Sequence, residues 1–341
     1  MPELASVDAL TVVRSTGSTN TLARELYGPA SANRGLRLVL ADKQTGGRGR
    51  LGRPWTSGVR TSFLSSYAAD VPAWLACGGM AGWLTLGAGV AVVETLRDVV
   101  HDDGHIAMKW PNDVYWDDCK LGGILTELAG IRPGDGAAAS AASDTQSTVA
   151  DAAGMAPADA VGSTAVVIFG IGINLFLGPE NLPTPISTSL HLHVRDIPDF
   201  DTLRLRLADG IARRLRDVVR TLETDPDARS SGLLRRATEL GCVAGRRVRV
   251  TLPDGTSRTG VARGIAADGG LDVGCDEGGE LYVRAADVGL LPRLAGAAGT
   301  ATEAPDALAG STIRLEPCNA QAAPAEAQAA GPAGPAAGSA S

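Results

Sequence analysis

The chain has 341 residues and a formal net charge of −7, and hydrophobic residues make up 44% of it. That fraction is enough for a packed core, so the composition excludes a wholly disordered chain, and the length allows about two or three domains. The acidic balance argues against a general nucleic-acid binder, because neutralising phosphates requires a basic face.

Residues 73–93 contain no charged side chain and are long enough to span a bilayer. Five of them are glycines, no basic flank sets an orientation, and the helical pattern continues with polar positions. We therefore predict a buried core helix over residues 73–100 and no membrane association. The N-terminus has no basic-then-apolar run, so no signal peptide is expected. The five scattered cysteines favour reduced thiols and a cytoplasmic location.

The remaining elements follow from the hydrophobic patterns in chain order. Residues 16–27 begin with Ser and Thr and continue with helical spacing, which predicts a capped helix. Residues 203–223 have clear helical periodicity. The apolar, β-branched stretch 166–175 is predicted to be a buried central strand. The other predicted strands are residues 36–42, 61–68, 105–110, 113–116 and 121–130.

Three further segments define the predicted domains. Residues 132–163 are mostly Ala, Gly, Asp, Ser and Thr, so they bury too little surface to order themselves and are predicted as a disordered insertion. Residues 246–290 contain short strands separated by Pro-Asp-Gly and Gly-Gly turns, which indicate a small β-barrel. An Ala/Gly/Pro-rich tail, residues 294–341, is predicted to be disordered. The boundaries are therefore 1–240, 241–293 and 294–341.

A glycine- and arginine-rich stretch, GGRGRLGRPW, occupies residues 46–55. Its glycines match the dinucleotide fingerprint G-x-G-x-x-G, but no apolar helix follows, so a nicotinamide-binding turn is rejected. Glycines let the backbone approach a ligand, arginines bind phosphate or carboxylate, and Trp55 presents a flat ring. The composition fits a cationic flap over a phosphorylated intermediate and fits a solvated loop equally well.

Two more stretches carry candidate functional residues. Lys109, Asn112, Asp113 and Lys120 lie close together in KWPNDVYWDDCKLGGIL, where a proline break and two glycines favour a ligand site. An ordinary turn and hairpin is the alternative. In GIGINL, residues 170–175, Asn174 ends an apolar strand. A buried polar group needs partners, so Asn174 either caps local backbone or reaches a ligand.

Joined with STN at residues 18–20 and with Gln44, these stretches resemble the biotin protein ligases. The matching motifs are STN, Gln44 with GGRGRLGRPW, KWPND (109–113), KLGGIL (120–125) and GIGIN (170–174). The resemblance covers about residues 14–290 apart from the insertion. Any one motif would be a weaker signal than the five in this order.

The resemblance implies an α/β (α+β) fold. It implies a mixed-sheet catalytic domain similar to class II aminoacyl-tRNA synthetases, followed by a small SH3-like β-barrel. It also implies an enzyme, a biotin–[biotin carboxyl-carrier protein] ligase. Such enzymes activate biotin with ATP and Mg²⁺ to biotinyl-5′-AMP. They then transfer biotin to a lysine on the biotin carboxyl carrier domain of a biotin-dependent carboxylase, such as acetyl-CoA, acyl-CoA or pyruvate carboxylase.

Site roles are carried over motif by motif. Lys120, Arg50 and Asp113 are the implied catalytic residues: Lys120 at the biotin carboxylate and α-phosphate, Arg50 in the flap, and Asp113 beside the incoming lysine. No metal ligands are implied. The implied biotin-binding residues are Ser18, Thr19, Asn20, Gln44, Gly47, Arg48, Arg50, Lys120, Gly123 and Gly172. The implied nucleotide-binding residues are Arg48, Arg50, Arg53, Trp55, Lys109, Asn112 and Asn174.

Relatives that also act as repressors carry an N-terminal helix-turn-helix domain. Few residues precede the STN motif here, so we expect the enzyme-only class, no nucleic-acid partner, and a monomer or weak homodimer. A lipoate–protein ligase is the alternative enzyme, but its flap lacks G-R-G-R-x-G-R-x-W and its pocket lacks K-W-P-N-D. An RNA-binding protein using the Gly-Arg stretch is the alternative from another class, and its three arginines are few for that role.

Overall fold

A computed structural model describes residues 4–132 and 162–291. Its largest part is a seven-stranded mixed sheet in the order β1-β2-β5-β9-β8-β7-β6. Strands β1 and β2 run parallel, and every other neighbouring pair in this sheet is antiparallel. The strands are β1 Ala9–Val13, β2 Leu36–Ala41, β5 Ser62–Pro72, β6 Ile106–Lys109, β7 Asp113–Trp116, β8 Cys119–Arg132 and β9 Thr164–Asn174.

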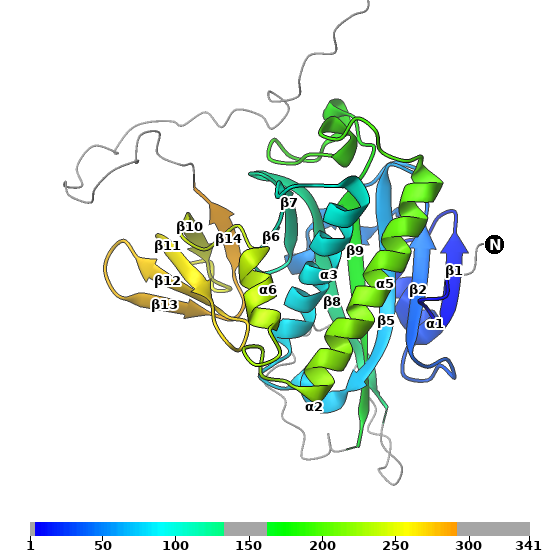
Figure 1. Ribbon diagram of the computed structural model, residues 1–341, viewed down its shortest axis with the longest axis horizontal. Helices are drawn as coiled ribbons and strands as arrows, with labels where there is room; N and C mark the ends of the chain where they lie inside the picture. Colours follow the sequence, from blue (N-terminus) through cyan, green and yellow to red (C-terminus); the bar gives the residue numbers. More distant parts are fainter. Residues whose placement is uncertain (1–3, 133–161, 292–341) are drawn as a thin grey trace, which may run out of the picture.

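Helices cover both faces of this sheet. Figure 1 shows α3 (Gly82–Val100) and α5 (Phe200–Thr224) lying across one face, while α1 (Thr19–Tyr27) packs on the other against β2, β5 and β9. Along β9, odd-numbered residues from Ala165 to Ile173 belong to the main core beneath α3 and α5, whereas Val166 and Ile168 belong to the smaller core beneath α1. Because side chains alternate along a strand, Gly170, Gly172 and Asn174 lie on the α1 face.

The uncharged stretch is a core element, as predicted, but it forms two helices. A short α2, Ala73–Cys77, ends before Gly78, and α3 begins at Gly82. The glycines in α3 permit close packing: a Cβ on Gly87 would collide with Val218 of α5, and one on Gly89 would collide with Met108 of β6. Among the described residues, no helix is long and apolar enough to cross a membrane.

The C-terminal part is a five-stranded antiparallel sheet in the order β13-β12-β11-β10-β14. Helix α6, Leu233–Glu239, leads into it. The indole nitrogens of Trp83 in α3 and Trp110 just after β6 donate to the carbonyls of Ala267 and Gly269, which attaches the C-terminal part to the larger one. Its strands are β10 Arg247–Thr251, β11 Ser257–Ile265, β12 Leu271–Cys275, β13 Glu280–Val283 and β14 Asp287–Leu290.

Two sequence predictions need correction here. Arg132 is the last residue of β8 and forms an ion pair with Asp70 of β5, so the insertion begins after it; residues 133–161 and 292–341 lie outside the described part. The prediction of reduced thiols holds for Cys77, Cys242 and Cys275, which are free, but is wrong for Cys119, which is disulfide-bonded.

Candidate active site

The candidate site is built on a row of neighbouring positions that crosses five strands. Leu64 of β5 is the register partner of Gly172 in β9, which in turn is the partner of Gly123 in β8. Gly123 is the partner of Asp113 in β7, and Asp113 is the partner of Lys109 in β6. Two adjacent glycines at the centre leave bare backbone on the α1 face, which admits a ligand close to the sheet.

One end of the row carries a cluster of opposite charges. The Asp113 carboxylate accepts from Lys120 Nζ at 2.7 Å through Oδ1 and from Lys109 Nζ at 3.4 Å through Oδ2. The Lys109 side chain is 5% exposed, whereas that of Lys120 is 33% exposed. Lys120 is therefore the ammonium group that a substrate above the glycines can approach. Burial raises the pKa of the neighbouring Tyr115 well above its usual range, so it is a neutral phenol beside Lys109.

The glycine- and arginine-rich stretch forms a small hairpin. Strand β3, Gly47–Arg48, pairs with β4, Pro54–Trp55, and the turn between them contains Leu51 in a left-handed conformation (φ 56°) with a side chain that is 70% exposed. A strained, exposed tip on a short two-residue ladder is typical of a segment that moves. The hairpin thus has the build of a flap.

Trp55 of this hairpin lies directly over Gly172. A Cβ placed on Gly172 would be 2.6 Å from Trp55 Cε2 and 2.7 Å from Cζ2, so only glycine lets the indole approach β9 so closely. Gly47 is constrained in the same way, because a Cβ there would lie 2.7 Å from the Trp55 carbonyl oxygen and 2.8 Å from Gln44 Nε2. Through Trp55, the flap therefore covers the glycine row, which is formed by the register partners Gly172 and Gly123.

The three arginines of the hairpin point to different partners. Arg48 Nη2 donates to Thr21 Oγ1 at 2.8 Å, at the start of α1. Arg50 Nη1 donates to Asn112 Oδ1 at 3.0 Å and to the Ala286 carbonyl at 3.3 Å.

The third arginine, Arg53, pairs with Asp287 of β14. The hydrogen bond with Asp287 raises the pKa of Arg53. Burial acts to raise the pKa of Asp287, but the hydrogen bond and the charge of Arg53 act against burial, and the pKa of Asp287 is lowered. Arg53 was predicted at the nucleotide, but in this structure it attaches the flap to the C-terminal sheet.

The STN motif and Gln44 meet at the N-terminus of α1. Gln44 Oε1 accepts from the Thr19 backbone nitrogen at 2.7 Å and from Thr19 Oγ1 at 3.0 Å. The helix predicted over residues 16–27 begins at Thr19, and Ser18 occupies its N-cap position without a side-chain capping hydrogen bond. Ser18, Thr19 and Gln44 thus form one polar corner beside the hairpin.

Asn20 behaves differently from its two neighbours in the motif. Its Nδ2 donates to Glu127 Oε2 at 2.7 Å and to the Leu125 carbonyl at 3.3 Å, and its Oδ1 accepts from Ser66 Oγ at 2.6 Å. It also sits over Gly170, where a Cβ would collide with it. The whole carboxamide is used within the protein, so Asn20 fixes the start of α1 onto the sheet.

Two asparagines, Asn112 just before β7 and Asn174 at the end of β9, hold backbone with one side-chain group each. Asn112 Nδ2 donates to the Ile124 carbonyl at 2.9 Å, which leaves its Oδ1 to accept from Arg50. Asn174 Nδ2 donates to the Thr188 carbonyl at 2.9 Å, and Asn174 Oδ1 is buried without a hydrogen-bond partner among the described residues. Asn174 therefore holds local backbone, which is one of its two predicted roles, and its Oδ1 leaves the other role, contact with a ligand, as a prediction.

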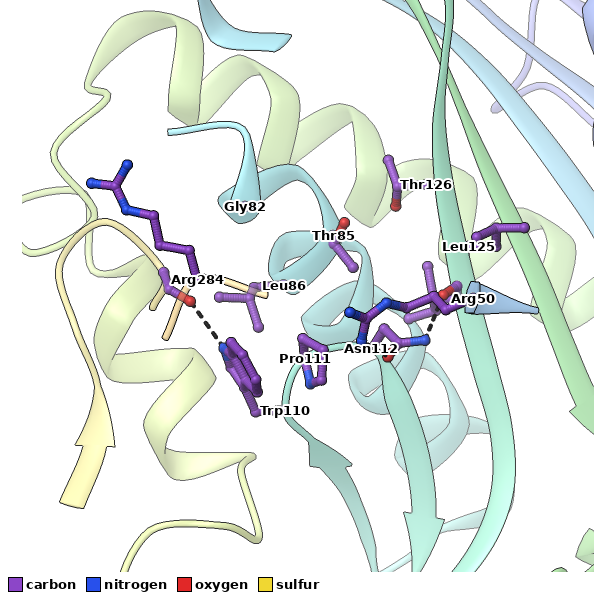
Figure 2. A pocket seen from close by; sticks show the side chains of 12 residues that line it. Arg50, Gly82, Thr85, Leu86, Trp110, Pro111, Asn112, Leu125, Thr126 and Arg284 are labelled. Carbon is purple, nitrogen blue, oxygen red and sulfur yellow. Dashed lines mark hydrogen bonds between the residues drawn. The ribbon is translucent and has the colours of Figure 1, made fainter. Parts of the chain in front are cut away.

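A cleft with a cavity volume of about 40 Å³ lies between the large sheet and the C-terminal sheet. Figure 2 shows Arg50 on one side of it, Arg284 on another, and the turn at Pro111 and Asn112 between them. Thr85 and Leu86 of α3 complete its wall. Among the described residues no group of three or more His, Cys, Asp or Glu side chains is placed to hold a metal ion.

Comparison with known proteins agrees with this geometry. The model of the Biotin/lipoate A/B protein ligase family matches residues 12–137, and that of the Biotin protein ligase C terminal domain matches residues 243–291. A relative from Mycobacterium tuberculosis, biotin--[acetyl-CoA-carboxylase] ligase, is 32% identical over 289 residues, which are 82% of this chain and 88% of the relative. The chain belongs to the biotin protein ligase family.

Other biotin protein ligases match smaller parts or the fold. The bifunctional ligase/repressor BirA of Escherichia coli is 40% identical over 101 residues, which are 29% of each chain. The biotin protein ligase from Aquifex aeolicus, solved in complex with biotin and ATP, has a TM-score of 0.59 at 21% identity, covering 84% of this chain and 100% of that one. A mutant of the Aquifex aeolicus ligase in complex with biotin also gives 0.59, at 22% identity over 82% and 98% of the chains. At this identity the likeness shows the biotin protein ligase fold.

Three residues of this biotin protein ligase escaped the sequence analysis. Thr188 links Lys120 and Asn174, because its N–H donates to the Lys120 carbonyl at 2.8 Å and its carbonyl accepts from Asn174. Arg284 lines the cleft from the C-terminal sheet, and Glu127 holds Asn20. Nothing near Thr188 or Arg284 marks them in the sequence, since long-range folding alone brings them to the site. Glu127 carries a signal: it is a lone acid inside an apolar strand pattern.

Proposed function

We propose that this chain catalyses the ATP-dependent biotinylation of a lysine on a biotin carboxyl carrier domain through biotinyl-5′-AMP. The observation that carries this proposal is the placement of Lys120 and Asp113 against the bare Gly123–Gly172 backbone beneath the arginine hairpin. A flat apolar substrate with one carboxylate fits such a surface once the flap carries Trp55 off Gly172, because its rings then lie on the glycines and its carboxylate meets Lys120.

In the first step, a biotin carboxylate oxygen attacks the α-phosphorus of ATP. A P–O bond forms, the bond to the β-phosphate oxygen breaks, and pyrophosphate leaves with that electron pair. Negative charge crowds where the carboxylate meets the phosphate. The Lys120 ammonium and the Arg50 guanidinium offset it, and each well-aimed donor contributes about 3 kcal/mol by analogy with oxyanion sites.

In the second step, the amine of the carrier lysine attacks the acyl carbon of the mixed anhydride. A C–N bond forms, the bond to the AMP oxygen breaks, AMP leaves with that electron pair, and the nitrogen loses a proton to water. Asp113 lies next to Gly123 in the row, and its carboxylate faces Lys120 and Lys109. It therefore holds the Lys120 ammonium beside the reacting groups. We propose that it also orients the incoming lysine.

The two substrates are assigned to opposite parts of the site. The corner of Ser18, Thr19 and Gln44, next to Gly47, offers short polar groups for the biotin ureido ring. Asn20 fixes this corner in place through its own hydrogen bonds. Residues assigned to the nucleotide are Arg48, Arg50, Trp55, Lys109, Asn112 and Asn174.

The cleft beside Arg50 suits a polyphosphate. Guanidinium groups bind phosphate oxygens in a fixed fork geometry, and Arg50 and Arg284 both line this space. The Asp113 carboxylate faces two lysines, so it is not arranged as a resident metal ligand. We therefore propose that Mg²⁺ enters with ATP, chelated by its phosphates.

The domain assignment follows the same reasoning. We propose that residues 1–240 form a catalytic domain similar to class II aminoacyl-tRNA synthetases and that residues 241–293 form an SH3-like barrel. The enzyme would act in the cytoplasm as a monomer or weak homodimer on a biotin-dependent carboxylase of the acetyl-CoA, acyl-CoA or pyruvate class. A relative's name, acetyl-CoA-carboxylase ligase, supports the first of these acceptors.

An exchange assay tests the proposal and separates it from lipoate ligation. The purified protein is incubated with Mg-ATP, labelled pyrophosphate and either biotin or lipoate. We expect biotin-dependent exchange of label into ATP and no comparable exchange with lipoate. Exchange that depends on lipoate alone, or that needs neither acid, would contradict the proposal.

A further inference from the structure

Strand β5 carries three buried serines, and two of them, Ser62 and Ser65, face opposite sides of the sheet. Ser62 and Ser65 are both 0% exposed. Along β5, Phe63 and Tyr67 belong to the core beneath α3 and α5, so Ser65 faces that core. Side chains alternate, and Ser62 therefore lies on the α1 face with the glycine row. Its hydroxyl has no hydrogen-bond partner within residues 4–132 and 162–291.

Ser62 lies beside a second polar group that is buried and has an atom without a hydrogen-bond partner among the described residues. Its register partner in β9 is Asn174, which is 3% exposed. The Asn174 Nδ2 group is held by the Thr188 carbonyl, so the orientation of the carboxamide is fixed and its Oδ1 can only accept. That Oδ1 is itself unpartnered within the described ranges. A hydroxyl and a fixed acceptor thus stand next to each other on one face.

A third group completes the set. Trp55 Nε1 is buried without a partner in the described part of the chain, and its ring lies over Gly172, two residues before Asn174 on the same face. A buried polar group that makes no hydrogen bond destabilises a fold, and most native side chains avoid it. Ser65 Oγ also has no partner among the described residues, but it lies on the opposite face of the sheet. Three such groups around one point of a candidate site support the idea that they bond to something that binds there.

We propose that Ser62 contacts the base of the nucleotide and that, with Asn174, it reads the polar edge of adenine. This inference rests on the proposed function and extends it to the choice of nucleotide. Adenine presents an amino group next to a ring nitrogen, which is a donor beside an acceptor. The amino group donates to Asn174 Oδ1, and the Ser62 hydroxyl donates to the adjacent ring nitrogen. The Trp55 ring supplies a flat surface beside the base.

The arrangement also predicts discrimination against guanine. Guanine places a carbonyl oxygen where adenine has the amino group, so it would face the Asn174 acceptor with another acceptor. The carboxamide cannot turn to present its amino group without breaking the bond to the Thr188 carbonyl. A site built on fixed polar groups rejects an analogue that leaves them unpaired.

The test compares Ser62→Ala with Ser65→Ala, a matched control in the same strand, equally buried and on the opposite face. Biotin-dependent pyrophosphate release is followed with ATP, GTP and biotin varied in turn. We expect Ser62→Ala to raise KM for ATP about tenfold, to leave KM for biotin unchanged, and to reduce the preference for ATP over GTP. Ser65→Ala should keep all three values.

Thermal unfolding without substrates provides a second readout. Replacing an unpartnered buried hydroxyl by a methyl group removes a desolvated polar atom, so Ser62→Ala should be at least as stable as wild type while binding ATP less well. If Ser62→Ala raised KM for biotin instead, or behaved like Ser65→Ala in every assay, the inference would be overturned. A wild-type protein without biotin-dependent exchange would refute the proposed function, which is a different outcome.

Discussion

Replacing Lys120 by alanine should abolish most adenylate formation and leave the fold intact. Lys120 and Lys109 share the single carboxylate of Asp113, so this cluster carries one net positive charge. Without Lys120 the remaining pair is neutral, and nothing in the cluster offsets the charge of the biotin carboxylate and the α-phosphate. Loss of one preorganised charge-stabilising donor of this kind lowers kcat about 10²–10³-fold, or about 3 to 4 kcal/mol.

The effect on folding should be much smaller. The Lys120 side chain is one-third exposed, and ion pairs that reach solvent contribute about 1 kcal/mol or less to stability. Lys109 remains paired with Asp113 at 3.4 Å, so no buried charge loses its partner. We therefore expect Lys120→Ala to keep its Tm within a few degrees of wild type while its catalytic rate falls by orders of magnitude.

Biotin-dependent pyrophosphate release measures the rate, and Arg220→Ala is the control for a change of one charge. Arg220 lies on α5 with a side chain that is 73% exposed, in an ion pair with Asp217. Lys120→Arg should recover part of the rate, because it restores the charge with a different geometry. A near-wild-type rate for Lys120→Ala would refute the assignment of Lys120 to the reacting groups.

Three further predictions follow from the same geometry. Arg50→Gly should release biotinyl-5′-AMP faster, because the flap loses its bonds to the turn below it; unchanged retention of the adenylate after rapid dilution would count against a flap. Gly123→Ala should fold normally, because its Cβ would come no closer than 3.4 Å to another atom, but it should bind biotin at least tenfold more weakly. Gly172→Ala should also lower Tm, because its Cβ would lie 2.6 Å from Trp55. Equal Tm values for the two variants would contradict this. Burial lowers the pKa of His193, so the unfolded state binds more protons and stability should fall as pH drops below about 6.5. His193→Gln should make stability depend less steeply on pH. His105→Gln should make it depend more steeply, because it removes a histidine whose pKa is raised by the hydrogen bond with Asp117. Denaturant titrations from pH 7 to pH 5 measure both slopes.

The sequence predicted those features that depend on local pattern. The apolar, β-branched stretch 166–175 located β9 at the centre of the sheet. The uncharged glycine-rich stretch is a core element because its glycines pack against Val218 and Met108. The break between α2 and α3 was missed, since Gly78 and Gly79 were read as part of one helix. Propensity alone does not separate a glycine that ends a helix from one that packs inside it.

Within the site, the motifs identified residue types better than they identified partners. Lys120 and Asp113 were expected near each other and form an ion pair. Arg53 was grouped with the flap arginines, but it bonds to Asp287, which lies more than two hundred residues away in the chain. Asn20 was grouped with Thr19, but its carboxamide is used by β5 and β8. Partners of this kind depend on sheet order, which a local motif does not contain.

The central claim is biotin transfer to a carrier lysine, and intact mass measurement tests it directly. The protein is incubated with biotin, Mg-ATP and a biotin carboxyl carrier domain. This ligase has only three lysines of its own, and Lys109 and Lys120 are paired with Asp113, so its own mass is an internal control. We predict one biotin-sized increase on the carrier, lost when its acceptor lysine is replaced by arginine, and no equal increase on the ligase. An unmodified carrier in the presence of all three components would contradict the account.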